Sequence, residues 1–463
     1  MSGKRPKIQH KQLRLAFASE GRVENPDTED QGTEPRVAKP ALESPAQEER
    51  LMEEVCDRQN LEIAWKRVRG NKGSPGVDGM TINAAVDYLR EHWPTVRSQL
   101  LKGTYQPQPV RRVEIPKADG GVRKLGVPCV VDRLIQQAVL QVLQRQWDPT
   151  FSEHSYGFRP GRSAHQAVAQ AQTYVAEGYC YVVDIDLEKF FDRVNHDILM
   201  ARIAERISDK RLLKLIRAFL NAGVMENGLV SPTTEGAPQG GPLSPLLSNL
   251  VLDDFDKELT RRGHRFCRYA DDCNIYVRSR RAGERVMASA CHFLTTRLRL
   301  KVNESKSAVA LPEERKFLGF SIANDGSERR IASKSLDRFK MRVRELTRRT
   351  RGVSVEQLVE PLARYLIGWR GYFGFCQTPL VLSHLDAWIR RRLRMYLWRQ
   401  WKNGRNRFKE LRRRGVPKFR AAVAAGSPTG FWHMSRQPAV QQALRNAYFD
   451  SIALPRVAAS SHA

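Results

Sequence analysis

The sequence lacks the features of a membrane or secreted protein. No stretch approaches the ~18 to 20 consecutive apolar residues that a transmembrane helix needs. Residues 1–10 have no apolar signal-peptide core. The 7 cysteines are scattered and include no C-x-x-C pair, which indicates neither a disulfide framework nor a zinc site. We therefore expect a protein that works in a reducing cytoplasm without contacting a membrane.

Acidic residues are scarce relative to basic ones. The chain has 78 Lys and Arg against 50 Asp and Glu, so its formal net charge is +28, which is more than solubility requires. Residues 338–420 alone hold 23 basic and 5 acidic side chains, or +18 of that excess. A polyanionic partner such as a nucleic acid is the plainest explanation.

Length and periodicity predict several compact units that mix helices and strands. The 463 residues allow about three units of ~150 residues each, and residues 19–47 have the apolar-poor composition of a linker. Helices are expected at 50–68, 132–147, 212–220 and from 333 onward. A strand is expected at 179–187, and hairpins at 110–128 and 266–277. The expected helix ends include caps at Asn195 and at the Ser354–Gln357 pair, and a left-handed Gly223.

Acidic residues end two of the predicted strands. Asp184 and Asp186 close the strand at 179–187, and Asp271 with Asp272 forms the tip of the second hairpin. Nucleotidyl transfer uses two divalent cations ~3.5 to 4 Å apart, and carboxylate oxygens bind such ions. Aspartate is also common in solvated turns, so the Tyr-x-Asp-Asp tip alone leaves both interpretations open.

Two longer blocks accompany the acidic tip. Residues 186–192 read Asp-Leu-Glu-Lys-Phe-Phe-Asp, and residues 236–245 read Gly-Ala-Pro-Gln-Gly-Gly-Pro-Leu-Ser-Pro. With these blocks, the chain from residue 50 to residue 457 resembles the reverse transcriptases encoded by bacterial group II introns. Two features separate this family from shorter bacterial reverse transcriptases. One is an extra block at 70–79, and the other is the basic helical region that follows the primer grip, expected at 317–319.

The resemblance implies a catalytic centre. The positions that bind two Mg²⁺ ions are then Asp186, Leu187, Asp271 and Asp272, of which the three aspartates are catalytic. Phe191 becomes the steric gate that excludes a ribose 2′-OH. Asp184 is the competing choice for the first carboxylate, but the spacing to Phe191 matches the family from Asp186.

The substrate contacts follow from the same resemblance. The expected dNTP-binding residues are Lys117, Arg123, Phe191, Gln239 and Lys306. The expected primer grip is Phe317, Leu318 and Gly319. Lysine and arginine suit phosphates, and glycine lets the backbone approach a substrate closely. Taken singly, the cations match solvated surface residues, the glycine-rich block matches an ordinary turn, and the primer grip matches a piece of core.

Nucleic-acid contacts are expected in two places. Aromatic and arginine side chains suit base stacking and phosphate pairing, and the resemblance puts Tyr156, Arg159 and Arg162 near the template. In the basic region, the arginines mostly off the apolar stripe of their helix are Arg390, Arg391 and Arg394. The alternatives are a buried aromatic pair with surface arginines for the first group, and a helix-packing face for the second.

The implied fold is α+β, a right-hand polymerase with fingers and an antiparallel palm sheet, followed by an α-helical thumb or maturase domain. The expected domains are a basic N-terminal segment and linker at 1–49, fingers and palm at 50–330, the thumb or maturase domain at 331–425, and a DNA-binding-like extension at 426–463.

The implied activity is RNA-directed DNA synthesis together with RNA binding that supports splicing and retrohoming. The expected partners are group II intron RNA, an RNA template with a DNA primer, target DNA and dNTPs. A homodimer is compatible with this set of partners. No paired cysteines of an HNH endonuclease occur, so the chain resembles members without one. The alternatives are a maturase that does not use its polymerase site, a host-adapted enzyme of DNA repair or phage defence, and a nucleotide cyclase, which the 236–245 block does not fit.

Overall fold

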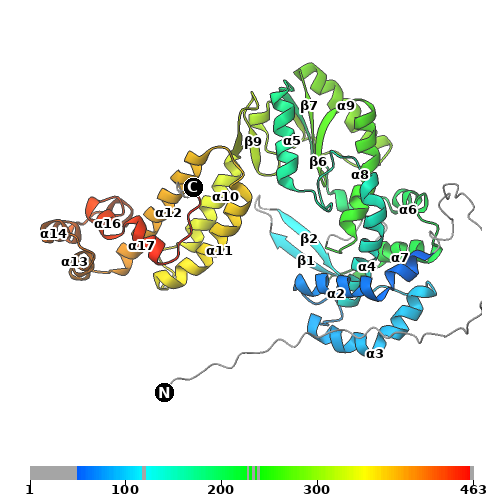
Figure 1. Cartoon of the computed structure of the whole chain (residues 1–463), viewed down its shortest axis with the longest axis horizontal. Helices are drawn as coiled ribbons and strands as arrows, with labels where there is room; N and C mark the ends of the chain where they lie inside the picture. Colours follow the sequence, from blue (N-terminus) through cyan, green and yellow to red (C-terminus); the bar gives the residue numbers. More distant parts are fainter. Residues whose placement is uncertain (1–49, 117–120, 227–228, 232–234, 237–239, 459–463) are drawn as a thin grey trace, which may run out of the picture. The chain divides into compact units, whose positions relative to one another are not determined.

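A computed structural model describes residues 50–116, 121–226, 229–231, 235–236 and 240–458. Lys117 and Gln239, two of the expected dNTP-binding residues, lie outside the described residues. The chain divides into two compact units, each built from segments far apart in the sequence (Figure 1). The first comprises Met1–Ser163, Ile185–Cys273 and Arg285–Ala308, and the second comprises Ala164–Asp184, Asn274–Glu284 and Val309–Ala463.

The first unit begins with helices packed around α4 (Val130–Trp147), which is buried around most of its circumference. The helices that precede it are α1 (Leu51–Val55), α2 (Arg58–Gly70) and α3 (Ile82–Leu101). The prediction of a single helix at 50–68 was wrong, because two helices occupy this stretch. Asp57 accepts hydrogen bonds from the backbone N–H groups of Gln59 and Asn60 and so begins α2 anew.

A buried carboxyl group lies in the first turn of α4. Asp132 accepts hydrogen bonds from the Tyr105 hydroxyl at 2.9 Å and from the Gln108 backbone N–H at 3.1 Å. Burial raises the pKa of Asp132 to about 7, the charge of Asp78 acts in the same direction, and the two hydrogen bonds oppose the rise. This carboxyl group therefore titrates near neutral pH.

The first expected hairpin is confirmed. β1 (Val110–Pro116) pairs antiparallel with β2 (Val122–Val127), which places Ile115 opposite Arg123. β4 (Val224–Glu226) joins β1 in parallel and β5 (Leu229–Ser231) joins β4, so the sheet order is β2-β1-β4-β5. Arg123 therefore lies on an edge strand, where it is exposed.

Among the remaining helices of the first unit, the one over residues 210–221 confirms the helix expected at 212–220. These remaining helices are η2 (Asp148–Thr150), η3 (Phe190–Asp192), α6 (His196–Ala204), α7 (Lys210–Asn221), α8 (Ser244–Arg261) and most of α9 (Arg280–Thr296). Asn195 caps α6 through two backbone N–H groups, as expected. Gly223 follows α7 with a φ of +78°, the left-handed conformation predicted for it.

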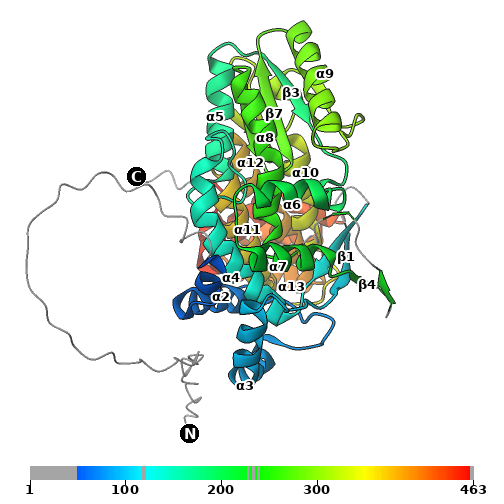
Figure 2. The ribbon, with the colours of Figure 1, turned by 90° about the vertical axis from the view of Figure 1, so that its right-hand side faces the viewer.

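A second four-stranded sheet carries the acidic residues. Its order is β6-β7-β3-β8, with β6 at Arg265–Tyr269, β7 at Asp272–Val277, β3 at Tyr181–Ile185 and β8 at Ala308–Ala310. Figure 2 labels β7 and β3 of this sheet. The expected strand at 179–187 and the hairpin at 266–277 are thus confirmed. Helices and sheets together confirm the α+β fold class.

The second unit is largely helical. α5 (Ala164–Ala176) packs on β9 (Phe320–Ile322), which follows η4 (Pro312–Glu314) and pairs with β10 (Arg329–Ile331). The helices after 333 are α10 (Ser333–Leu346), α11 (Val355–Phe373), α12 (Pro379–Gln400), α13 (Gly404–Arg413), α14 (Lys418–Gly426), α15 (Phe431–Met434), α16 (Pro438–Ala443) and α17 (Asn446–Ser451). One continuous apolar cluster runs through them. The capping box of Ser354 with Gln357 begins α11, as expected. In the described part of the chain, no helix is long and apolar enough to span a membrane.

Candidate active site

The acidic tip of the β6–β7 hairpin is a two-residue turn, Ala270-Asp271. Ala270 has a φ of +57°, which is uncommon for a residue with a side chain. Asp271 is half-buried in the turn, and Asp272 begins β7 with an exposed side chain. The residue just before Asp271 thus has a backbone conformation that needs support from its surroundings.

Arg268 supplies part of that support from beneath the turn. Its side chain is fully buried and uses all five of its N–H donors. Nη1 donates to the Ala270 carbonyl at 2.9 Å and to Asn249 Oδ1 at 3.0 Å. Nε and Nη2 donate to the two oxygens of Asp256 at 2.7 and 2.5 Å, and Nη2 also donates to Ser155 Oγ at 2.8 Å. The strained turn is therefore hydrogen-bonded to a saturated buried network.

Residues 154–157 support the turn from a second side. Arg268 and the chain at His154–Tyr156 exchange backbone hydrogen bonds, with lengths of 2.9 and 2.8 Å. A Cβ on Gly157 would overlap the backbone nitrogen of Ala270. Asn249 donates to the Gly157 carbonyl at 2.9 Å and so joins this segment to the network. Only glycine allows so close an approach.

Asp186 and Asp271 are close enough to influence each other. Burial raises the pKa of Asp271, and the negative charge of Asp186 adds to the rise. Arg123, from the β1–β2 hairpin, acts on the same carboxyl group and opposes the rise. The site thus pairs two carboxylates that a cation would stabilise. Within the described residues, no three Asp, Glu, His or Cys side chains form a ready-made metal site.

Asp184 and Asp186 have different surroundings. Asp184 Oδ2 accepts hydrogen bonds from Nε and Nη2 of Arg315 at 2.9 and 2.6 Å. Lys306 Nζ lies 3.8 Å from Asp186 Oδ2, and the Asp186 backbone N–H donates to Ser307 Oγ at 3.0 Å. A tight ion pair therefore occupies Asp184, which favours Asp186 as the carboxylate available to a metal.

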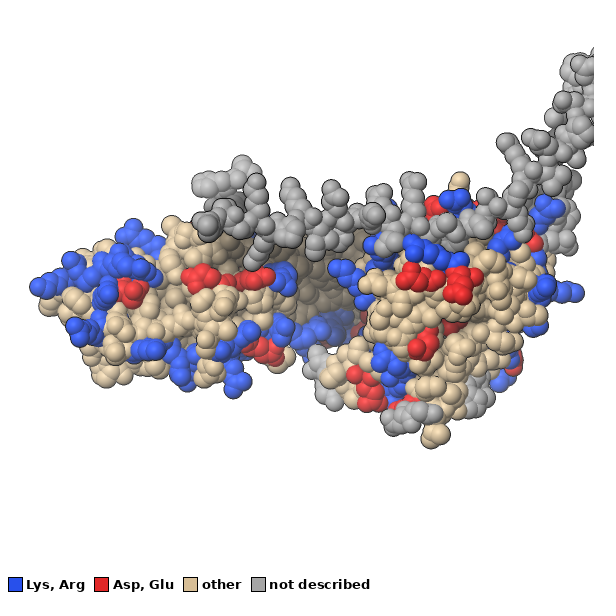
Figure 3. All heavy atoms as spheres, turned by 90° about the horizontal axis from the view of Figure 1, so that it is seen from below, with Lys and Arg blue, Asp and Glu red and all other residues tan. Residues whose placement is uncertain are grey.

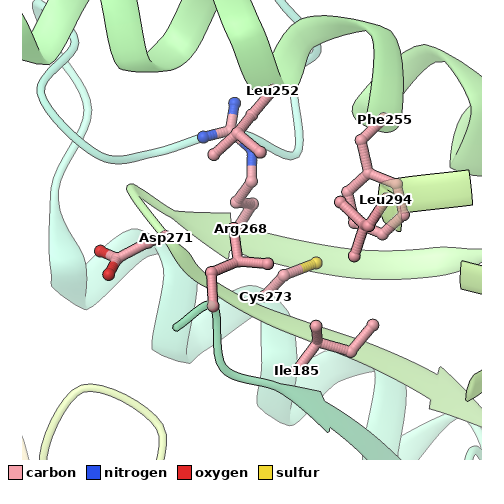
Figure 4. A pocket seen from close by; sticks show the side chains of 8 residues that line it. Ile185, Leu252, Phe255, Arg268, Asp271, Cys273 and Leu294 are labelled. Carbon is pink, nitrogen blue, oxygen red and sulfur yellow. The ribbon is translucent and has the colours of Figure 1, made fainter. Parts of the chain in front are cut away.

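Leu187 lines a small cavity behind the turn. Its neighbours there include Leu252, Phe255 and Leu294, which give the cavity apolar walls. In Figure 4 the carboxylate of Asp271 points away from these apolar side chains. The cavity is therefore a packing feature behind the acidic residues, and the carboxylate is presented on the other side.

The block at 236–245 begins next to the expected steric gate. A Cβ on Gly236 would lie 2.9 Å from the Phe191 carbonyl oxygen, and the Gly236 N–H donates to the Val194 carbonyl at 2.8 Å. A Cβ on Gly240 would lie 2.7 Å from the carbonyl oxygen of Gly126 in β2. The glycines of this block thus let it contact both Phe191 and the first hairpin.

Comparisons with known proteins agree with this arrangement. A family profile described as "Reverse transcriptase (RNA-dependent DNA polymerase)" matches residues 115–322, and one described as "Group II intron, maturase-specific domain" matches residues 336–415. "Protein YkfC" of Escherichia coli is 33% identical over 303 residues, which cover 56% of this chain and 79% of that protein. The chain belongs to the group II intron reverse transcriptases.

Other relatives of this reverse transcriptase are matched over smaller shares of their length. "Group II intron-encoded protein LtrA" of Lactococcus lactis subsp. cremoris is 38% identical over 196 residues, which cover 42% of this chain and 32% of that protein. A chain of a solved "Partial Cas6-RT-Cas1--Cas2 complex" is 24% identical with a TM-score of 0.35, and the match covers 53% of this chain and 43% of that one. A reverse transcriptase domain implies a requirement for a divalent metal, and the carboxylate pair of this chain fits one.

The expected primer grip of this reverse transcriptase is a tight turn. Leu318 and Gly319 have φ values of +52° and +88°, and Phe317 and Phe320 exchange backbone hydrogen bonds on either side. The Tyr372 hydroxyl of α11 donates to the Leu318 carbonyl at 2.7 Å. A helix of the maturase-profile region therefore stabilises a turn of the polymerase-profile region.

The residues expected near the template have mixed surroundings. Tyr156 is buried, and Arg162 lies over its ring at 5.7 Å. Arg159 is buried and hydrogen-bonded to Asp148 Oδ1 at 2.9 Å and to three backbone carbonyls, which makes it a structural anchor. Phe158, the other aromatic residue of this block, is 48% exposed and lies 6.3 Å from the Tyr269 ring. The alternative of a buried aromatic pair therefore holds for Tyr156 but not for Phe158.

The arginines of α12 are mostly engaged within the protein. Arg391 lies 3.7 Å from the centroid of the Trp432 ring and donates to Ser435 Oγ at 3.3 Å. Arg394 donates to the Leu444 carbonyl at 3.0 Å. Arg390 is half-exposed. Two of the three arginines expected to contact nucleic acid thus connect α12 to the C-terminal helices.

Proposed function

We propose that this reverse transcriptase extends a DNA primer on an RNA template, using two Mg²⁺ ions held by Asp186, Asp271 and Asp272. The observation that best supports this proposal is the proximity of Asp186 to Asp271 on elements that the fold brings together. Leu187 is adjacent in the chain and would complete the metal-binding positions.

The reaction joins one nucleotide to the primer. The primer 3′ oxygen forms a bond to the α-phosphorus of a dNTP, the bond from that phosphorus to the bridging oxygen breaks, pyrophosphate leaves, and the 3′ hydroxyl loses its proton. Bound Mg²⁺ would lower the pKa of that hydroxyl and offset the charge of the leaving group. The protein's own contribution is to hold its carboxylates in place before substrate arrives.

The dNTP would lie between the first hairpin and the acidic turn. Arg123 supports this placement, because its charge already acts on Asp271. Lys117 and Lys306 would add charge along the triphosphate, and Phe191 with Gln239 would face the sugar and the nascent base pair. Phe317, Leu318 and Gly319 would hold the primer end.

The proposal is tested with Asp271→Asn, compared with Asp87→Asn, an exposed carboxylate on α3. Primer extension on an RNA template with Mg²⁺ should fall to background in the first variant and stay normal in the second. Because burial and the charge of Asp186 disfavour ionised Asp271, the Asn variant should have a higher Tm than the wild type in EDTA. Mg²⁺ should raise the Tm of the wild type more than that of the variant. Unchanged extension by Asp271→Asn would refute the assignment.

We further propose that the chain acts in the cytoplasm on group II intron RNA, and that it supports splicing and retrohoming into target DNA. The maturase profile at 336–415 and the charge of +18 over 338–420 support an RNA-binding role. Binding of the cognate intron RNA should exceed that of an unrelated structured RNA of equal length at physiological salt. Equal affinity for both RNAs would argue against a maturase role.

A further inference from the structure

Three arginine side chains converge on one aromatic ring in the second unit. The guanidinium carbons of Arg349, Arg399 and Arg407 lie 5.8, 5.8 and 5.7 Å from the centroid of the Phe431 ring. They come from three places in the chain: the loop after α10, the last turn of α12, and α13. The fold therefore gathers cations that the sequence keeps far apart.

None of these three guanidinium groups has an acidic partner among the described residues. Many other arginines of this unit do, including Arg342 with Glu345 at 2.8 Å and Arg364 with Glu360 at 2.6 Å. Nε of Arg407 is shielded from solvent and has no hydrogen-bond partner in the described part of the chain. An unpaired buried donor is unfavourable, and the three guanidinium groups around the ring carry charges of the same sign. An anion would accept from such a donor and offset the charge.

Phe431 fixes the geometry of this cluster. Its ring packs against the apolar cluster of the helical unit and is half-buried. Arg407 also lies over Trp398, at 5.0 Å from the ring centroid. Cation–π contacts hold guanidinium groups in place without using their hydrogen-bond donors. The donors of Arg349 and Arg399, both exposed, therefore stay available to a ligand.

We propose that Arg349, Arg399 and Arg407 around Phe431 form a binding site for backbone phosphates of a nucleic acid. One guanidinium group can donate to two phosphate oxygens at the same time. A nucleic-acid backbone carries several phosphates and can therefore bind several guanidinium groups at once. Lys and Arg side chains gather at the end of the helical unit that holds α13 and α14, which favours a polyanion over a single small anion (Figure 3). We place the phosphate contact of this region here instead of at Arg391 and Arg394, each of which donates from Nε to another part of the protein.

The inference takes from the proposed function only that the partner is a nucleic acid. Its test measures binding and does not require DNA synthesis. The double variant Arg349→Gln/Arg399→Gln is compared with Arg342→Gln/Arg364→Gln, which removes the same formal charge from exposed, ion-paired arginines. Equilibrium binding of a 30-base-pair DNA duplex and of an RNA hairpin is measured without dNTPs from 50 to 300 mM NaCl. The same measurement in an Asp271→Asn background separates this test from that of the active site.

We expect the slope of log affinity against log salt to become shallower by about 1 to 2 for at least one probe, since each phosphate contact contributes ~0.7 to 0.9. The control should keep the wild-type slope, and Arg349→Lys/Arg399→Lys should restore most of it. The probe that responds identifies the nucleic acid, and a response with both indicates shared phosphate recognition. Loss of cation–π contacts alone would lower the Tm and leave the slope unchanged. An unchanged slope with both probes in a folded variant overturns the proposal.

Discussion

The guanidinium group of Arg268 donates a 2.9 Å hydrogen bond to the carbonyl of Ala270, the residue whose positive φ forms the acidic turn. The same group forms a fully buried ion pair with Asp256. Because every N–H of Arg268 is used, the turn cannot shift without breaking a hydrogen bond inside the protein. The position of the Asp271 carboxylate thus depends on a charge in the core.

Arg268→Lys tests that dependence. Lysine keeps the charge beside Asp256 but lacks the planar fork that reaches Ala270, Asn249 and Ser155. We expect kcat for primer extension to fall about 10- to 100-fold, the effect of misplacing a catalytic group by ~1 Å, with little change in KM for primer-template. The free energy of unfolding should fall by about 3 kcal/mol.

The matched control is Arg262→Lys, at the exposed end of α8, where the side chain pairs with Glu258 at 2.6 Å. Its kinetics and stability should stay close to wild type, because an exposed pair contributes at most about 1 kcal/mol. Wild-type kcat in a folded Arg268→Lys enzyme would show that the network does not position the turn.

Gly157→Ala should damage the same turn from its other side. The added Cβ would overlap the Ala270 backbone nitrogen, so one of the two segments must move. We expect extension to fall at least ~10-fold and the free energy of unfolding to fall by about 1 to 3 kcal/mol. Gly70→Ala serves as the control, because a Cβ there meets no atom within 4 Å and alanine favours the end of α2. Equal activity of the two variants would contradict the close contact.

Asp132→Asn should change how stability depends on pH. The pKa of about 7 in the folded state lies above the ordinary value of 3.8, so protonated Asp132 stabilises the fold at low pH. That contribution is complete below the unfolded pKa and is lost as pH rises through about 7. Relative to the Asn variant, the wild type should lose roughly 3 kcal/mol in urea unfolding between pH 5 and pH 8. Parallel pH profiles of the two proteins would show that Asp132 is ionised throughout.

The features that were predicted correctly are those that depend on residues adjacent in the sequence. The caps at Asn195 and Ser354, the left-handed Gly223 and both hairpins depend on a few adjacent residues. The break between α1 and α2 is also local, yet the helical periodicity of 50–68 concealed the competing cap at Asp57. Sequence therefore predicted the element types better than their boundaries.

Side-chain partners that depend on the path of the chain were not predicted. In the sequence, Arg159 and Arg391 cannot be told apart from solvated arginines that bind phosphate. In the fold, a backbone carbonyl accepts from Arg159 and an aromatic ring lies beside Arg391. Arg268 is one of two arginines in β6, and nothing in its spacing indicates Asp256 or Ala270 as partners. The candidate acidic residues were identified by motif, whereas their supporting network required the structure.

The bond from the Tyr372 hydroxyl to the Leu318 carbonyl limits how this enzyme can be shortened. A recombinant fragment that stops at residue 330 would keep the whole polymerase profile but lose α11, and with it the donor that stabilises a left-handed leucine. It would also divide the second compact unit and expose the apolar side of β9. A minimal polymerase made from this chain therefore has to extend through α11, and shortened versions should be trimmed from the C-terminal helices inward.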